Sequence, residues 1–219
     1  MNKSTPCPYI SIMGTMGSGK TTASRLIAKE FGFHLVEENF GENAFLPRFY
    51  KKMSRWSFHS QTFFLMEKIH QLMEIKNELM KPTIPACRFG IVQDTPIEQD
   101  VFSYAKAQHV LGNMDDAEWK LYQKIYDSFA PHLPKPSLTI YLETSIPVIC
   151  KRIVSRGRGY EKKIPKKYLS LLDSLNHEWI GKNKNQQVIS ISTDGLNIVT
   201  NMSHQGELID MIKGVIHKM

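Results

Sequence analysis

Residues Gly14-Thr15-Met16-Gly17-Ser18-Gly19-Lys20-Thr21 follow an apolar stretch from Tyr9 to Met13 and precede a helix-forming stretch from Thr22 to Phe31. The octapeptide has a glycine, four further residues and then Gly-Lys-Thr, which is the pattern of a phosphate-binding loop between a strand and a helix. Glycine lets the loop backbone turn its N–H groups inward toward an anion, where a Cβ atom would obstruct them. The stretch therefore predicts a nucleotide-binding α/β protein.

The loop also predicts its ligands. We expect Lys20 to reach the β- and γ-phosphates of ATP and the hydroxyl of Thr21 to bind Mg²⁺, while the helix that begins at Lys20 adds its positive dipole end. The expected nucleotide contacts in this region are Gly14, Thr15, Met16, Gly17, Ser18, Gly19, Lys20, Thr21 and Thr22. Phosphate loops serve GTPases, motor ATPases and small-molecule kinases, so the loop leaves the reaction open. A regulatory GTPase is disfavoured, because Asn183-Lys184-Asn185-Gln186 lacks the aspartate of a guanine-reading segment.

Five apolar, β-rich stretches alternate with stretches of helical period, which is typical of a parallel sheet covered by helices. The expected strands are residues 9–13, 33–37, 90–93, 138–143 and 188–192. No repeat, low-complexity tract or linker divides the chain, and its 219 residues suit one compact unit. We therefore predict a single domain over residues 1–219.

Three expected helices have clear signals. The first begins at Lys20 and ends at Gly32. The longest runs from about Ser54 to Met80, and a third opens with Asp115 and Glu118 as a capping box. The longest helix carries an apolar stripe that consists of Leu65, Ile69, Leu72 and Met73. Such a stripe indicates core or a subunit interface.

The net charge of +7 comes from one segment. Between Lys151 and Lys167 there are eight basic residues and one acid, Glu161, whereas charges elsewhere nearly balance. A solvated helix face is one interpretation of such a run. The phosphate loop favours the other, a basic cover for a phosphorylated small molecule, so neither a nucleic-acid polymer nor a membrane is expected as a partner.

Cysteine usage favours a reducing cytoplasm. Cys7, Cys87 and Cys150 are odd in number and widely spaced, which indicates neither a disulfide framework nor a zinc site. The apolar stretch from Tyr9 to Met13 is too short to span a bilayer, and we expect a soluble protein.

Five ordered blocks resemble the deoxynucleoside kinase family, in particular its bacterial deoxyadenosine/deoxyguanosine kinase members, from about Ile10 to Trp179. The blocks are GTMGSGKTT, the pair Glu37-Glu38, FYKKMSRWSFHSQTFFL from Phe49, IVQDTPIEQDVF from Ile91 and RIVSRGRGYEKKIPKKYL from Arg152. The resemblance implies a P-loop kinase fold: a five-stranded parallel sheet flanked by helices, a helical lid over the phosphates, and a dimer built on long helices.

In the family, a strand-end glutamate takes the proton from the 5′-hydroxyl of the sugar, and the resemblance gives this task to Glu38. Carboxylates at strand ends of such folds face the ligand crevice. Adjacent Glu37 would point the opposite way. Because the pair is ambiguous by one residue, an exposed acidic loop start stays open as the alternative.

The resemblance also implies the contacts to the nucleoside. Tyr50 and Glu161 match the residues at the 3′-hydroxyl, although Tyr50 could instead serve packing. Gln61 matches the glutamine that bonds the base, and its amide offers both a donor and an acceptor. Asp100 matches the aspartate that senses the base. A nucleoside is therefore the expected small-molecule partner.

The lid is expected to supply three arginines. Arg152 and Arg156 are one helical turn apart and Arg158 follows. By the resemblance they stabilise charge on the γ-phosphoryl group, and Arg152 and Arg156 bind the ATP phosphates. With Lys20 and Glu38 they complete the expected catalytic set.

The sequence departs from the family after the third strand. The family carries an acid followed by Arg-Ser, and this chain has Asp94-Thr95-Pro96. Asp94 can still hold Mg²⁺ through water. Thr95 removes the arginine that the family places beside the catalytic glutamate and the 5′-oxygen, and transition-state arginines contribute roughly 10³–10⁵ in rate.

Further departures lie nearby. Lys68 stands where relatives often have arginine, Asn39 replaces a proline and Glu98 replaces a tyrosine. We expect either a changed substrate choice, with Lys68 or Arg88 supplying the missing charge, or decay toward a nucleotide binder.

Three hypotheses follow. The first is an ATP:deoxynucleoside 5′-phosphotransferase that acts on a purine or cytosine nucleoside, most simply as a homodimer. The second is a pseudokinase or partner subunit, because of Thr95. The third is a nucleoside monophosphate kinase, whose acceptor phosphate would meet basic residues near Tyr50. These residues are Arg48, Lys51, Lys52 and Arg55, which a solvated helix surface explains as easily.

Overall fold

The computed structural model describes residues 8–38, 40–79, 90–161 and 164–216. Its centre is one sheet of five parallel strands, as predicted, and the strand order is β2-β3-β1-β4-β5. The strands are β1 (Tyr9–Met13), β2 (His34–Val36), β3 (Ile91–Asp94), β4 (Leu138–Glu143) and β5 (Val188–Ser192). Their bounds lie within one or two residues of the expected ranges.

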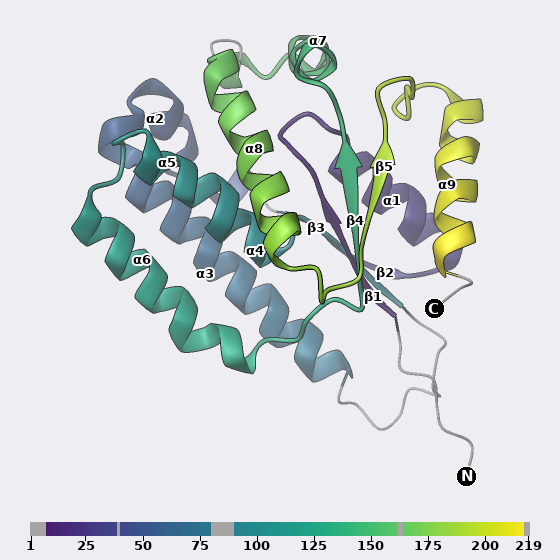
Figure 1. Cartoon of the computed structure of the whole chain (residues 1–219), viewed down its shortest axis with the longest axis horizontal. Coiled ribbons are helices and arrows are strands. Elements are labelled where there is room, and N and C mark those ends of the chain that lie inside the picture. Colours follow the sequence, from purple (N-terminus) through teal and green to yellow (C-terminus); the bar gives the residue numbers. More distant parts are fainter. Residues whose placement is uncertain (1–7, 39, 80–89, 162–163, 217–219) are drawn as a thin grey trace.

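Helices lie on both faces of the sheet (Figure 1). They are α1 (Lys20–Phe31), α2 (Leu46–Lys51), α3 (Met53–Leu79), α4 (Ile97–Gln99), α5 (Lys106–Val110), α6 (Asp116–Phe129), α7 (Ile146–Arg156), α8 (Lys166–Lys182) and α9 (Met202–Ile216). A π-helical segment, Asp100–Ala105, joins α4 to α5. Short 3₁₀ turns span Phe40–Glu42, Ala130–His132 and Gly159–Glu161.

Local signals set the ends of the predicted helices. Gly32 ends α1 in the left-handed conformation and donates its N–H to the carbonyl of Ala28. The capping box at the start of α6 is present, with Asp115 accepting from the N–H of Glu118 and the Glu118 side chain accepting from the N–H of Asp115. The long helix is α3, although Met80, its expected last residue, lies outside the described residues.

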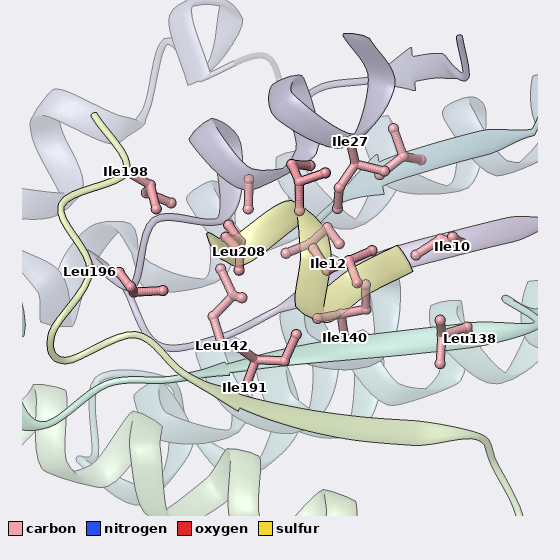
Figure 2. Packing of buried hydrophobic residues seen from close by; sticks show 14 residues of the cluster. Ile10, Ile12, Ile27, Leu138, Ile140, Leu142, Ile191, Leu196, Ile198 and Leu208 are labelled. Atoms are coloured by element: carbon pink, nitrogen blue, oxygen red, sulfur yellow. The ribbon is translucent and has the colours of Figure 1, made fainter. Parts of the chain in front are cut away.

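One face of the sheet is filled by isoleucine and leucine beneath α1 and α9 (Figures 1 and 2). Alternate residues of β1, Ile10 and Ile12, point into this layer, where Ile27 of α1 and Leu208 of α9 meet them. All four side chains are fully buried. This packing fixes α1, and with it the loop that precedes α1, against the sheet.

The other face is covered by α3, the helical stretch from α4 to α5, α6 and α8 (Figure 1). Leu65, Ile69 and Leu72 of α3 are buried there, as expected of the stripe. Met73 is 39% exposed and lies outside the core, which leaves the other predicted role of the stripe, a subunit interface, open for it. The stripe turns about the helix axis, and its fourth expected member falls beyond the buried face.

The order of the strands decides where ligands can bind. β1 lies between β3 and β4. The chain places β2 and β3 on one side of β1 and then crosses to place β4 and β5 on the other side, so the direction of winding reverses at β1. In open parallel sheets the crevice at the carboxyl ends of such strands is the ligand site. The carboxyl end of β1 leads directly into Gly14.

No described helix is long and apolar enough to cross a membrane. Cys150 is a free thiol, and Cys7 and Cys87 lie outside the described residues.

Candidate active site

The loop from Gly14 to Thr21 requires glycine at two positions. Gly17 and Gly19 have φ angles of 86° and 104°, in the left-handed region that side chains disfavour. A Cβ atom on Gly17 would also lie 3.1 Å from the side chain of Ile153 in α7. Gly19 is the N-cap of α1, so the amino end of that helix opens onto the loop.

Lys20 is held at the start of the loop. Its Nζ donates to the carbonyl of Gly14 at 2.8 Å and lies 3.4 Å from the hydroxyl of Tyr104. Burial lowers the pKa of Lys20, and attraction to Asp94 and Glu38 opposes that shift. The ammonium group therefore lies where a further anion would be attracted.

Gln99, which sequence reasoning missed, fixes the other side of Gly14. Its amide Nε2 donates to the carbonyl of Gly14 at 2.6 Å, and its Oε1 accepts from the N–H of Gly14 at 3.2 Å. Gln99 is fully buried and immediately precedes Asp100. Gln99 thus connects the phosphate loop, through Gly14, to the adjacent residue Asp100, which is expected to read the base.

Thr21 and Asp94 form the expected metal pair. The hydroxyl of Thr21 lies 2.5 Å from Oδ2 of Asp94, which is 1% exposed. No group of three or more His, Cys, Asp and Glu side chains capable of holding a metal occurs among the described residues. A hydroxyl and one carboxylate nevertheless suit Mg²⁺, which keeps waters and binds substrate phosphates. These two residues therefore fit the ion that the loop implies.

Thr95 follows Asp94 in an unusual backbone conformation. Its φ of 63° is left-handed, which is rare for a β-branched residue and costs about 1–3 kcal/mol. The N–H of Thr95 donates to the carbonyl of Ile12 at 3.0 Å, and its hydroxyl donates to Oδ1 of Asp94 at 3.1 Å. Strain of this kind is typical of functional sites, and the hydrogen bond from Thr95 helps to fix the side chain of Asp94.

The structure separates Glu37 from Glu38. Glu37 forms a two-bond ion pair with exposed Arg25, in which Nη2 donates to Oε2 at 2.9 Å. The Glu38 side chain turns inward, is 9% exposed and has its Oε1 3.6 Å from Nζ of Lys68. Burial raises the pKa of Glu38, and attraction to Lys68 opposes the rise. Glu38 is therefore the member of the pair that turns inward, beside Lys68.

Asp100 and Gln61 lie buried beside this centre. Asp100 is 3% exposed and Gln61, on α3, is 4% exposed. Burial raises the pKa of Asp100 well above its ordinary value, and repulsion from Glu38 adds to the effect. Oδ2 of Asp100 has no hydrogen-bond partner within the described part of the chain. A buried carboxyl group without a partner is available to a ligand.

The lid arginines differ in their contacts. Arg152 is bound by protein: its Nη1 donates to the carbonyl of Ser18 at 2.8 Å, and its Nη2 donates to the carbonyls of Thr193 and Leu196. It therefore ties the phosphate loop to the segment after β5. Arg152 and Arg156 are one helical turn apart, as expected, but the guanidinium group of Arg152 is bound to backbone carbonyls and does not stand beside Arg156 as a second open phosphate ligand.

Arg156 and Arg158 share one partner. Nη2 of Arg156 lies 2.5 Å from Oε2 of Glu161, and Nη1 of Arg158 lies 3.4 Å from Oε1. Glu161 is 3% exposed, and its turn contacts α2, the helix of Tyr50. The hydroxyl of Tyr50 lies 3.9 Å from the sulfur of Met16 in the phosphate loop. The expected phosphate and 3′-hydroxyl residues are thus neighbours.

Of the other residues that differ from the family pattern, Glu98 is described by the structure and Asn39 is not. Glu98 lines a cavity of about 870 Å³ between α6 and α8 together with Phe102, Trp119 and Trp179. The side chains of Glu38, Asp94 and Asp100 do not line this cavity, so it is distinct from the crevice at the carboxyl ends of the strands. Asn39 and Arg88, and Lys162 and Lys163 of the basic segment, lie outside the described residues.

Known proteins resemble this chain in sequence. A family model described as "Deoxynucleoside kinase" matches residues 10–217. The deoxyadenosine/deoxycytidine kinase of Bacillus subtilis is 30% identical over 210 residues, which cover 95% of this chain and 93% of that protein. The deoxyguanosine kinase of the same organism is 32% identical over 167 residues, which cover 76% and 75% of the two chains.

The fold agrees with a solved structure as well. Deoxyadenosine kinase from M. mycoides with bound dCTP superposes with a TM-score of 0.78 at 24% identity, over 96% of this chain and 100% of that one. At this identity the likeness shows the fold. Since the family model spans nearly the whole sequence, the chain belongs to the deoxynucleoside kinase family.

Proposed function

We propose that this enzyme transfers the γ-phosphoryl group of ATP to the 5′-hydroxyl of a deoxynucleoside with a purine or cytosine base. The observation that carries the proposal is the meeting of Lys20, the Thr21–Asp94 oxygen pair and buried Glu38 at the carboxyl ends of β1, β2 and β3. A donor site and a proton acceptor thus adjoin one crevice. The free thiol of Cys150 suits a reducing cytoplasm, where nucleotide salvage takes place.

In the proposed reaction Glu38 accepts the proton of the 5′-hydroxyl while that oxygen forms a bond to the γ-phosphorus. The bond from the γ-phosphorus to its bridging oxygen breaks, and ADP leaves. Lys20 and the amino end of α1 attract the β- and γ-phosphates. Thr21 and Asp94 would hold Mg²⁺, which when bound neutralises charge on phosphate oxygens. In this proposal Arg156 and Arg158 bind the ATP phosphates, either after their ion pairs with Glu161 break or while those ion pairs are kept.

Base choice is proposed to rest on Gln61 and Asp100. An amide and a carboxyl group provide donors and acceptors that match the edges of adenine, guanine and cytosine. The unpartnered Oδ2 of Asp100 supports this assignment. Relatives named for deoxyadenosine, deoxycytidine and deoxyguanosine support the same range of bases.

The pseudokinase alternative rests on Thr95, which stands where the resemblance to the family implies an arginine. The monophosphate kinase alternative is weaker. Arg48 and Arg55 both form cation–π contacts with Trp56, with guanidinium carbons 5.0 and 5.1 Å from the ring centre. Lys51 and Lys52 are exposed. Packing and solvation therefore account for these four basic residues.

A nucleoside panel tests the proposal. Purified protein with labelled ATP and Mg²⁺ is expected to convert at least one of deoxyadenosine, deoxyguanosine and deoxycytidine to its 5′-monophosphate. Thin-layer or liquid chromatography measures the product. The matching monophosphates, offered as acceptors under the same conditions, should give no diphosphate. Measurable ATP binding with no product from any nucleoside would instead establish the pseudokinase.

We further propose a homodimer formed by α3 and α6, which contact each other within the chain. Met66 and Met73, on one face of α3, are 44% and 39% exposed, and Leu121 of α6 is 50% exposed. Sedimentation velocity is expected to show a dimer that Leu121→Glu converts to monomer. Met202→Glu, at an 83% exposed site on α9, is the control and should stay dimeric. A wild-type monomer at micromolar concentration would contradict the proposal.

A further inference from the structure

The reacting centre has a surplus of acids. Glu38, Asp94 and Asp100 come from three different segments. Repulsion from Asp94 adds to the raised pKa of Glu38, and repulsion from Glu38 and Asp94 adds to the raised pKa of Asp100. Among the described residues, Lys68 and Lys20 are the cations that attract both Glu38 and Asp100. Three carboxyl groups would repel one another, so the position of each cation decides which carboxylate is usable.

Thr95 is uncharged and cannot supply a positive charge beside these carboxyl groups. Its polar groups are also engaged within the protein. It is fully buried, its N–H is bound by Ile12 and its hydroxyl by Asp94. Lys20 is assigned to the phosphates of ATP, and its Nζ donates to the carbonyl of Gly14 in the phosphate loop.

Lys68 is the cation that lies between Glu38 and the end of β3. It lies on α3, seven residues after Gln61, and its side chain is 2% exposed. Its Nζ lies 3.6 Å from Oε1 of Glu38 and donates to the carbonyl of Asp94 at 3.2 Å. Burying an ammonium group is costly unless it is paired and hydrogen-bonded, and both conditions hold here. One side chain thus connects the carboxylate on the β2 side to the end of β3.

We propose that Lys68 is the positioning residue of phosphoryl transfer: it fixes the carboxylate of Glu38 toward the crevice and supplies the fixed positive charge that Thr95 lacks. This inference rests on the proposed function and deepens it. The charge comes from α3 rather than from the residue after Asp94. The helix that carries the base-reading Gln61 therefore also positions the proton acceptor.

A double-mutant cycle tests the proposal. Lys68→Met keeps the length of the side chain and removes its charge, and we expect it to lower kcat roughly 10²-fold, the scale of general-base catalysis, with the KM for ATP changed less than about threefold. In a Glu38→Gln background the same substitution should lower kcat by less than about threefold, because Lys68 acts through Glu38. Lys68→Arg should recover much of the loss. Lys76→Met, on the same helix with Nζ bound to the carbonyl of His132, is the matched control.

Thermal unfolding of the wild type, Lys68→Met, Glu38→Gln and the double variant reports on the ion pair independently of activity. A coupled pair predicts that the shifts in Tm of the two single variants do not add in the double variant. Additive shifts, or independent losses in kcat that multiply, would overturn the role of Lys68, as would a folded Lys68→Met protein with wild-type kcat. A wild-type protein that phosphorylates no nucleoside is a separate result, which refutes the proposed function and the catalytic role together while the Tm cycle still decides the pairing.

Discussion

Glu38→Gln is expected to lower kcat about 10²-fold or more while the Kd for ATP stays unchanged, which is the scale of losing a general base. The amide has nearly the shape of the carboxylate but cannot accept the proton of the 5′-hydroxyl. The ATP phosphates are assigned to other residues, so donor binding should be retained. Steady-state kinetics with the best nucleoside of the panel and calorimetric titration of ATP measure the two quantities.

Glu37→Gln is the matched control for this prediction. Glu37 is the adjacent acid, but its side chain pairs with Arg25 at the surface instead of facing the crevice. Surface ion pairs contribute about 0–1 kcal/mol, so neither turnover nor stability should change much. Equal losses from Glu37→Gln and Glu38→Gln would show that the fold of the strand end, and not the proton acceptor, had been disturbed.

The pH dependence follows from the environment of Glu38. Burial raises its pKa above the ordinary 4.5 of glutamate, and Lys68, the largest opposing influence, limits the rise. A carboxyl group accepts a proton only when ionised, so kcat should fall as the pH decreases through this raised pKa. The acidic limb is expected at higher pH than an exposed glutamate would give, and it should be absent from the residual activity of Glu38→Gln.

The strands and the first helix could be predicted because their signals are local. Ile10 and Ile12 alternate with residues of the opposite face, and Gly32 alone specifies the end of α1. The family resemblance also predicted Glu38 as the inward member of the acidic pair, while the alternation of side chains along a strand predicted only that Glu37 and Glu38 point to opposite sides. The structure confirms that Glu38 faces inward.

The supporting contacts of the site could not be predicted in this way. Gln99 and Arg152 bind backbone carbonyls of Gly14, Ser18 and Leu196, and a carbonyl is common to every residue type. No sequence pattern marks such a partner. The ion pair of Lys68 with Glu38 joins residues that are separated by a turn, the helix α2 and the first half of α3, so only the assembled fold brings the two together.

Lys20→Met is expected to lower kcat roughly 10²–10³-fold, the scale seen when one fixed donor to a developing charge is removed. The N–H groups of the phosphate loop would still contact the triphosphate, but the ammonium group at its β- and γ-phosphates would be lost. Binding of ATP should weaken too, which distinguishes this variant from Glu38→Gln. Stopped-time product assays and calorimetry of ATP measure both effects.

Lys29→Met provides the matched control on the same helix, because Lys29 is exposed in the last turn of α1. It should keep wild-type kinetics. The wild-type Nζ of Lys20 is bound to the carbonyl of Gly14, so the variant also frees an acceptor that Gln99 shares. If this structural contact were the main role of Lys20, Lys20→Met would lower Tm and weaken ATP binding but leave kcat at saturating ATP near the wild-type value. A loss in kcat at saturation therefore assigns Lys20 to the transferring phosphoryl group.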